Sequence, residues 1–414
     1  MNISPALKNK TLVLQAWKAG VASVGGERVT RAAIAGDGVG GITHLLAVGK
    51  AAASMCAGAL DRLAEDGRAL VVTKYGHCGD AVAAHPRVVV IESGHPVPDQ
   101  NSLRAGRAVD AFVRAVPRGA RLVMLVSGGA SALAEVPVGA VELDTLQGIT
   151  GELLAGGYGI EQVNAARIRL SSIKGGKLLG RFGGESVRVY AISDVSGDSI
   201  ALIGGGIGGI NPPASPPDPL PQKIAGLLER VDPDPCGGQG AGGFTNGGFA
   251  HHVKIIGSNR IARWAAAEFL QARGLPVVIN EESLNRDIHA AAQKIAADLL
   301  DGPAGAYIWG GEPTVVLPPK PGIGGRNQSL ALAVAGEIRG RGNLAVLVAG
   351  TDGTDGPTAV AGGLVDGDTF NAASGASNAL LKANAGTYLA RIAALFKPGP
   401  TGTNVMDLAI AIKR

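Results

Sequence analysis

The sequence predicts an α/β protein with two domains, and three observations support this prediction. Short apolar runs alternate with Ala- and Leu-rich helical patterns, which is typical of a mostly parallel sheet flanked by helices. The chain has 414 residues, more than one ordinary hydrophobic core organises. A stretch rich in glycine and proline, residues 204–249, interrupts the alternation, so we expect domains at 1–245 and 250–414.

The first domain is predicted from five apolar runs and the helical patterns around them. Residues 1–20 have the pattern of an amphipathic helix, and 103–116 that of a helix opened by the loop 95–102. Within the glycine-rich stretch only 222–231 has a helical pattern. The predicted strands are 42–48, 68–76, 87–94, 121–129 and 187–194.

The second domain repeats the alternation without an internal repeat of fixed period. We expect helices at 259–274 and 284–300, and a third that begins close to Arg326. The predicted strands are 252–258, 275–280, 305–311 and 343–350, the last being the most apolar.

Composition excludes several classes of protein. The 64 glycines have no collagen-like period and indicate tight loops. The net charge is +4 and no basic run is interleaved with aromatic residues, which favours small anionic ligands over nucleic acid. Cys56, Cys78 and Cys236 are isolated and fit reduced thiols. No apolar run approaches the ~20 residues of a membrane span and residues 1–20 contain no signal-peptide core, so we expect a soluble, cytoplasmic protein.

Two standard nucleotide motifs fail a strict test. G-x-G-x-x-G occurs at residues 36–41, before a predicted strand, and at 204–209, where Asn211 and two prolines follow in place of a helix. Neither has the strand–turn–helix context of a dinucleotide site. A P-loop is also missing, because His44 stands where the first glycine would precede Gly49-Lys50.

Polar and glycine-rich residues recur where predicted strands end. Gly49-Lys50 follows the first strand, residues 127–131 (Ser-Gly-Gly-Ala-Ser) follow the fourth, and Asp194 ends the fifth. In parallel α/β sheets ligands bind at the carboxyl ends of strands, where free helix N–H groups attract anions. We therefore expect an anion site that includes Lys50, Ser127, Gly128, Gly129 and Ser131.

Further charged residues allow two interpretations each. Glu312 ends a strand, and Asp352 and Asp355 follow the most apolar one; they fit magnesium ligands or simple Asx turns. Lys174, with Arg167 upstream, is either a site residue or part of a solvated basic face. His95 either orders its loop or acts as an acid–base group.

The chain resembles one family closely, the class II glycerate 2-kinases, whose C-terminal half is the MOFRL domain. The resemblance extends in the family's order from about residue 10 to the C-terminus. The matching segments are AVGKAAASM, VVTKYGH, ESGHPVPD, LVSGGASAL, NAARIRLSSIKGG, ISDVSGD, GGEPTVVL, GIGGRNQSLALA, AGTDGTDGPTAVAGGLVD and GPTGTNVMDL.

The resemblance implies ATP-dependent phosphorylation of D-glycerate at its 2-hydroxyl, with Mg²⁺ or another divalent cation. It also implies a Rossmann-like first domain, a second domain with a mixed sheet and an active site in the cleft between them. By matching motif, the functional lysine is Lys50 and the functional arginine is Arg326. The segments that line the family's cleft contain Ser127, Asn164, Lys174, Asp194, Glu312 and Asp352.

The chemistry of phosphoryl transfer suits these residues. Its transition state spreads negative charge over the equatorial oxygens, so catalysis is mainly positioning and cationic stabilisation. Lys50 suits a phosphate, and the planar fork of Arg326 suits a carboxylate or the migrating phosphoryl group. Metal held by Asp352 or Glu312 would offset the remaining charge, and Asp194 is the candidate proton acceptor.

The glycines before Arg326 are expected to serve that arginine. Gly322, Gly324 and Gly325 would let the backbone pass close to an anion, so that Arg326 and the helix N-terminus act on the same ligand. On this interpretation Gly325→Val reduces turnover far more than stability.

Two departures from the family pattern and two alternative functions accompany this interpretation. Residues 205–208 (Gly-Gly-Ile-Gly) replace a Ser-Gly-Pro-Thr turn, and Arg169 replaces a histidine common in the family. The alternatives are an NAD(P)H-dependent reductase of hydroxypyruvate or tartronate semialdehyde, a label the family has also carried, and a homologue that binds a small acid without turnover. The oligomeric state stays open, a homodimer included.

Overall fold

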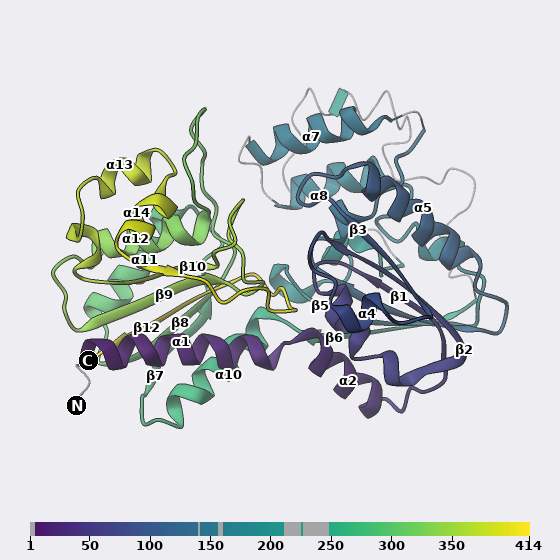
Figure 1. Cartoon of the computed structure of the whole chain (residues 1–414), viewed down its shortest axis with the longest axis horizontal. Coiled ribbons are helices and arrows are strands. Elements are labelled where there is room, and N and C mark those ends of the chain that lie inside the picture. Colours follow the sequence, from purple (N-terminus) through teal and green to yellow (C-terminus); the bar gives the residue numbers. More distant parts are fainter. Residues whose placement is uncertain (1–4, 140, 156–159, 211–224, 227–247) are drawn as a thin grey trace. The chain divides into compact units, whose positions relative to one another are not determined.

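The computed structural model describes residues 5–139, 141–155, 160–210, 225–226 and 248–414. The chain divides into two compact units, both visible in Figure 1. One comprises Gly26–Ile256, and we call it the N unit. The other combines Met1–Gly25 with Gly257–Arg414, and we call it the C unit.

The N unit is built on a six-stranded sheet with the order β3-β2-β1-β4-β5-β6. Its strands are β1 (Ile42–Val48), β2 (Leu63–Lys74), β3 (Val88–Ser93), β4 (Arg121–Ser127), β5 (Ser186–Ile192) and β6 (Ala250–Gly257). The first five are parallel to their neighbours. The order of the strands along the chain reverses between β1 and β4, as in a doubly wound sheet.

Helices cover both faces of this sheet. The helices are α2 (Gly26–Gly36), α3 (Ala52–Ala57), α4 (Asp80–Ala83), α5 (Gln100–Arg114), α6 (Ala130–Leu133), α7 (Leu143–Ala155) and α8 (Ile160–Arg169). Helix α3 packs against β1, β2 and β4, and α5 packs against β2 and β3 from the other face. Leu46 and Val48 of β1 join Val109 and Val113 of α5 in one buried cluster, because alternate strand residues share a face.

The C unit contains a second six-stranded sheet, with the order β11-β10-β9-β12-β8-β7. Its strands are β7 (Val277–Glu282), β8 (Gly305–Gly311), β9 (Leu344–Gly350), β10 (Gly362–Asp366), β11 (Leu395–Phe396) and β12 (Asp407–Lys413). Strands β7 and β8 are parallel, whereas β12 is antiparallel to both β8 and β9. The sheet is therefore mixed.

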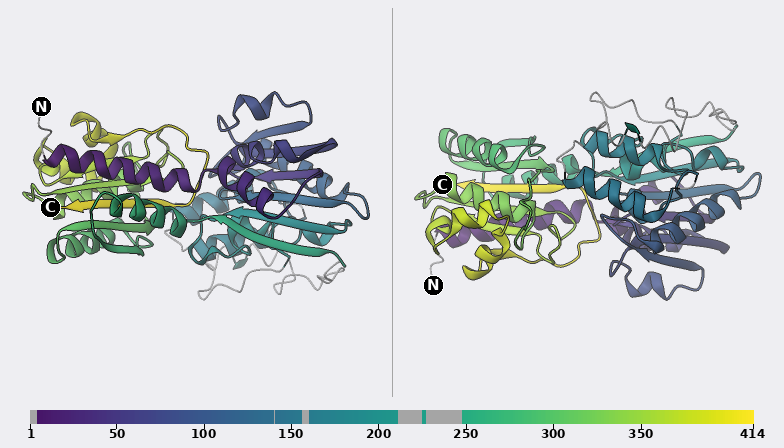
Figure 2. Two further views of the ribbon diagram at one scale, coloured as in Figure 1. Left: turned by 90° about the horizontal axis from the view of Figure 1, so that it is seen from below. Right: turned by 90° about the horizontal axis from the view of Figure 1, so that it is seen from above.

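Helices also cover both faces of the mixed sheet. They are α1 (Pro5–Ser23), α10 (Asn259–Gln271), α11 (Ile288–Asp301), α12 (Arg326–Glu337), α13 (Ala376–Leu381) and α14 (Ala385–Arg391). Helices α1 and α10 pack against each other and the same face, and α11, α12 and α14 lie on the other face (Figures 1 and 2). Asn327–Ala335 of α12 are buried, so this helix is part of the core.

The predicted fold class is confirmed, and two domain assignments are wrong. Helix α1 was expected in the first domain, but it packs on α10, β9 and β12 of the C unit, where Trp17 meets Phe396 edge to face. Strand β6 was expected to open the second domain, but it is hydrogen-bonded to β5 at the edge of the N-unit sheet. The predicted helix 222–231 lies almost wholly outside the described residues. No described helix is both long and apolar enough to cross a membrane.

Candidate functional site

Hydrogen bonds from the turn after β1 connect the carboxyl ends of β1 and β4. The backbone N–H of Lys50 donates to the carbonyl of Gly128 at 2.8 Å, and the N–H of Ala51 donates to Ser127 Oγ at 3.0 Å. Because the strand order reverses between β1 and β4, this turn lies at the topological switch point of the sheet. The backbone of Lys50 therefore lies where doubly wound sheets bind their ligands.

The geometry gives Ser127 a supporting part in this turn. Ser127 is fully buried and its hydroxyl accepts the Ala51 N–H, so its visible action is to hold the turn that carries Lys50. Gly49 has a φ of +131°, and a Cβ there would lie 2.2 Å from Ser127 Oγ. Only glycine allows this close approach of the two strand ends.

Gly129 lies close to the side chains of both Lys50 and His95. It has a φ of +83°, and a Cβ at this position would lie 3.0 Å from Lys50 Cγ and 3.1 Å from His95 Cδ2. The structure thus brings His95, for which the sequence left two interpretations, to the same carboxyl edge as Lys50. Asp194 also lies at this edge, because it follows Ile192 of β5, which pairs with Ser127 of β4.

A buried ion pair lies beyond the Gly129 turn. Lys174 Nζ pairs with the carboxylate of Glu135, and the two side chains are only 1% and 4% exposed. Burial lowers the pKa of Lys174, and the Glu135 charge opposes this shift. Burial also lowers the pKa of Arg167, again against the effect of Glu135. Lys174 therefore does not belong to a solvated basic face.

Two polar atoms at or near this ion pair have no hydrogen-bond partner among the described residues. Within the described part of the chain, Ser131 Oγ and Glu135 Oε1 are buried without a hydrogen-bond partner. A Cβ on Gly205, whose φ is +71°, would lie 3.1 Å from both Ser131 Oγ and Lys174 Cδ. The glycine turn that departs from the family pattern thus packs directly on two predicted site residues. Asn164 is buried on α8.

In the C unit, Arg326 is held by two carboxylates. Its Nε and Nη2 donate to Asp407 at 2.6 and 3.3 Å, and its Nη1 lies 2.8 Å from Glu312 Oε1. Burial alone would lower the pKa of Arg326, but Asp407 and Glu312 raise it well above its ordinary value. The side chain stays 34% exposed, so the guanidinium is oriented and still accessible.

The N-terminus of α12, expected to face a bound anion, is occupied by a carboxylate of the protein. Asp355 Oδ1 and Oδ2 accept the N–H groups of Asn327 and Gln328 at 3.1 and 2.8 Å, and Gln328 Nε2 donates a third hydrogen bond to Oδ2. Burial raises the pKa of Asp355 to about 6, against the effect of these donors. Only the Arg326 side chain, and not the first N–H groups of α12, is left for an external anion.

The expectation for the glycines before Arg326 changes accordingly. A Cβ on Gly325 would lie 2.3 Å from Asp355 Cγ, and one on Gly322 would lie 2.4 Å from Asn384 Cβ. Gly324 lies against Gly386 in the same way. These glycines allow the loop to pack on its own unit. This packing argues against the expectation that the glycines make room for an anion, and we now expect Gly325→Val to reduce stability as well as turnover.

The two predicted metal ligands already have partners in the protein. Asp352 Oδ1 accepts the N–H and the hydroxyl of Thr354 at 2.9 and 3.0 Å, which is an Asx turn. Glu312 Oε1 pairs with Arg326. The described residues contain no group of three or more His, Cys, Asp or Glu arranged to hold a metal ion. A Mg²⁺ ion that binds mainly to phosphate takes only one or two carboxylates from the protein, and this smaller number is compatible with Glu312 and Asp352.

The structure adds two residues to the predicted ones. Glu135 pairs with Lys174, and Asp407 orients Arg326. Each has a signal in the sequence: Glu135 is the one charged residue of the apolar segment 130–141, and Asp407 opens the alternating apolar run 408–412. A buried charge needs a partner, so each carboxylate could have been predicted to pair with a cation, but its position in the sequence does not show which cation.

Comparison with known proteins finds related sequences that match both units. Residues 12–224 match the family described as a domain of unknown function (DUF4147), and residues 305–407 match the MOFRL family. The chain is 35% identical to D-glycerate 2-kinase of Thermotoga maritima over 385 residues, which cover 89% of this chain and 90% of that protein. It is 32% identical to glycerate 2-kinase of Pyrococcus horikoshii, over 90% of this chain and 87% of that protein.

A solved structure is also similar. The crystal structure of glycerate kinase from Thermotoga maritima superposes with a TM-score of 0.78 at 31% sequence identity. The match covers 98% of this chain and 99% of that one.

Proposed function

This chain belongs to the class II glycerate 2-kinase family, and from this membership we propose that it phosphorylates D-glycerate at the 2-hydroxyl with ATP. The products are 2-phosphoglycerate and ADP. The observation that carries the proposal is the Lys50 turn, which joins β1 and β4 at the switch point of the N-unit sheet. That turn presents a cation where such sheets bind phosphates.

The proposed roles follow from the charge that develops during transfer. The 2-hydroxyl oxygen of glycerate attacks the γ-phosphorus, the bond from that phosphorus to the β,γ-bridging oxygen breaks, and the hydroxyl proton passes to Asp194. Lys50 stabilises the phosphate charge, with Gly128 and Gly129 keeping the backbone close to it. Arg326 binds the glycerate carboxylate or the migrating phosphoryl group through its fork.

The remaining predicted residues support these groups. Ser127 holds the Lys50 turn, and Lys174, Ser131 and Asn164 form the polar surroundings behind the Gly129 turn. Gly324 and Gly325 let the loop before Arg326 pack closely.

A divalent cation, Mg²⁺ in the first place, belongs to the proposal as the partner of ATP. When bound, it would neutralise charge on the phosphate oxygens. Glu312 and Asp352 are the carboxylates that would hold it. We further propose a cytoplasmic enzyme that acts on small molecules.

The deciding experiment is a pair of assays on the purified protein. The first couples ADP release to NADH oxidation in the presence of D-glycerate, ATP and Mg²⁺. The second follows NAD(P)H oxidation with hydroxypyruvate, without ATP or coupling enzymes. We expect D-glycerate-dependent ADP release and 2-phosphoglycerate in the first and no turnover in the second. Reductase turnover without any ADP release would replace the kinase by the reductase.

A further inference from the structure

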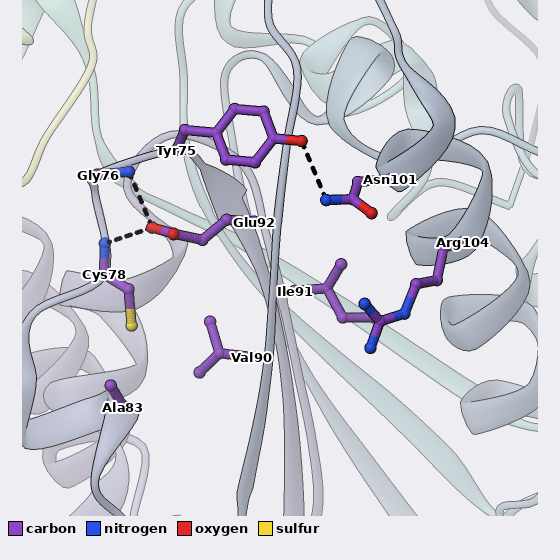
Figure 3. A pocket seen from close by; sticks show the side chains of 9 residues that line it. All are labelled: Tyr75, Gly76, Cys78, Ala83, Val90, Ile91, Glu92, Asn101 and Arg104. Atoms are coloured by element: carbon purple, nitrogen blue, oxygen red, sulfur yellow. Dashed lines mark hydrogen bonds between the residues drawn. The ribbon is translucent and has the colours of Figure 1, made fainter.

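The N unit contains a cavity of about 520 Å³ at the carboxyl ends of β2 and β3, separate from the Lys50 turn (Figure 3). Apolar side chains of β3 and α4 form one part of its wall, and polar groups from the loop after β2 and from α5 form the rest. The residues that line it are Tyr75, Gly76, Cys78, Ala83, Val90, Ile91, Glu92, Asn101 and Arg104.

The loop that shapes this cavity is fixed by Glu92. Its Oε1 accepts the N–H groups of Gly76 and Cys78 at 2.9 and 3.4 Å, as Figure 3 shows. Within the described residues Oε2 of the same carboxylate has no hydrogen bond. One oxygen therefore builds the cavity and the other can accept a hydrogen bond from a ligand.

The aromatic ring of Tyr75 is held in place at the rim. Its hydroxyl donates to Asp99 Oδ2 at 2.6 Å and accepts from Asn101 Nδ2 at 3.0 Å. The side chain is nevertheless 48% exposed. The guanidinium of Arg104 points toward Ile91 (Figure 3) and makes no hydrogen bond or ion pair within the described residues. A rigid exposed ring and a free guanidinium are the groups that bind a flat, polar-edged ring system.

The distance from the cavity to the Lys50 turn suits a nucleotide that occupies both. Thr73 of β2 donates from Oγ1 to the Lys50 carbonyl at 3.5 Å, and the same Thr73 is the register partner of Glu92. The strands β1, β2 and β3 are consecutive neighbours about 4.8 Å apart, so Glu92 lies on the order of 10 Å across the sheet from the strand that ends at Lys50. A nucleoside is long enough to reach from Glu92 to the β1 end, so its base can occupy the cavity while its phosphates lie at Lys50.

Taking the proposed kinase activity as its premise, we propose that this cavity binds the nucleoside end of ATP. The base stacks on Tyr75 on the Ile91 face of β3, where Arg104 contacts its edge, and a ribose hydroxyl donates to Glu92 Oε2 around the end of the strand. The triphosphate then runs along the carboxyl edge of β2 toward Lys50.

Titration calorimetry with two probes tests the cavity apart from the reaction. The non-hydrolysable ATP analogue AMP-PNP occupies both the cavity and the phosphate position, whereas inorganic tripolyphosphate occupies the phosphate position alone. We expect Tyr75→Ala and Arg104→Ala each to weaken AMP-PNP binding about tenfold or more and to leave tripolyphosphate binding unchanged. Val89→Ala, at an exposed position of the same strand β3, is the matched control and should bind both probes like the wild type.

Steady-state kinetics separates this inference from the proposed function. Tyr75→Ala should raise KM for ATP with little change in kcat or in KM for D-glycerate. Wild-type AMP-PNP affinity in both cavity variants, or no AMP-PNP binding by the wild-type protein, overturns the nucleoside site. If the wild type releases no ADP with D-glycerate, the proposed reaction fails, and the AMP-PNP titrations alone still decide the cavity. Thermal melting confirms that the variants are folded.

Discussion

Arg326 and Asp407 form a two-bonded ion pair between the first residue of α12 and the first residue of β12. The carboxylate is buried, whereas a third of the arginine side chain is exposed. Such a pair fixes the plane of the guanidinium, because both parallel N–H groups must face one carboxylate. Asp407 therefore sets the direction in which the free edge of Arg326 points, and Glu312 sets the other side.

Replacing Asp407 by Asn tests this orienting role. The amide keeps the shape but loses the charge and one acceptor oxygen, so we expect kcat to fall about 10- to 100-fold while KM for ATP changes little. In Arg326→Ala, kcat should fall further than in Asp407→Asn. The control is Asp366→Asn, which breaks the ion pair with Lys10 at the opposite end of the same sheet. Equal kinetics for Asp407→Asn and the wild type would show that Arg326 needs no orientation.

Lys50 should be the most sensitive position of the N unit. Removing the cation that we propose faces the phosphates is expected to lower kcat/KM about 10²- to 10³-fold. Because the turn is held by backbone groups and Ser127, Lys50→Ala should leave the circular dichroism spectrum unchanged. Lys18→Ala, an exposed lysine on α1, serves as the matched control. Near-wild-type turnover in Lys50→Ala would remove Lys50 from the mechanism.

The buried pair of Lys174 and Glu135 predicts a non-additive effect on stability. Lys174→Met leaves Glu135 buried without its cation and should lower the free energy of unfolding by about 3–5 kcal/mol. The double variant Lys174→Met, Glu135→Leu leaves no charge and should recover much of that loss. Urea denaturation followed by circular dichroism measures both. Additive losses in the two single variants would mean that the pair is not coupled in solution.

The sequence predicts the strands and the cations of the site better than their partners. Apolar runs and strand-end glycines are local signals, so β1, β4, β5, β8 and β9 and the residues Lys50 and Arg326 could be located from them. A carboxylate partner is a distant residue: Asp407 lies 81 positions from Arg326 along the chain. Such a pairing is set by the order of strands in a sheet, which no local pattern encodes.

The same reasoning explains the errors in domain assignment. Helix α1 has an amphipathic pattern that shows it must pack, but the pattern does not show against which sheet. Its site in the C unit depends on contacts such as the Thr403 hydroxyl, which donates to the Val24 carbonyl at 2.7 Å across almost the whole chain. Proximity in sequence favoured the N unit, and packing decided otherwise.

Gly325 should be a stability position as much as an activity position. A methyl group there would meet the side chain and backbone of Asp355 at less than ordinary contact distance, so the loop or the carboxylate must move. We expect Gly325→Ala to lower the free energy of unfolding by about 1–3 kcal/mol and to reduce turnover as well. Gly342→Ala, at a site with open space around the backbone, is the control. Unchanged stability in Gly325→Ala would restore the view that this glycine serves only the ligand.

The pKa of Asp355 predicts a particular dependence of stability on pH. Burial raises this pKa from 3.8 to about 6, so the folded protein holds the proton more tightly than the unfolded chain does. Between these two values the folded state binds more protons, and stability must therefore rise as the pH falls. The contribution is fully present below pH 3.8 and is lost as the pH rises through about 6, a change of about 3 kcal/mol.

Asp355→Asn isolates this contribution, because asparagine does not titrate and the other groups cancel in the comparison. The free energy of unfolding of the wild type minus that of Asp355→Asn should increase by about 3 kcal/mol from pH 7 to pH 4. Tryptophan fluorescence in urea is the suitable probe, since all three tryptophans, Trp17, Trp264 and Trp309, lie in the C unit with Asp355. A difference that stays constant or shrinks toward pH 4 would mean that the α12 N-terminus and Arg326 keep Asp355 ionised in the folded protein. In that case the cap would be a charged one throughout the working pH range.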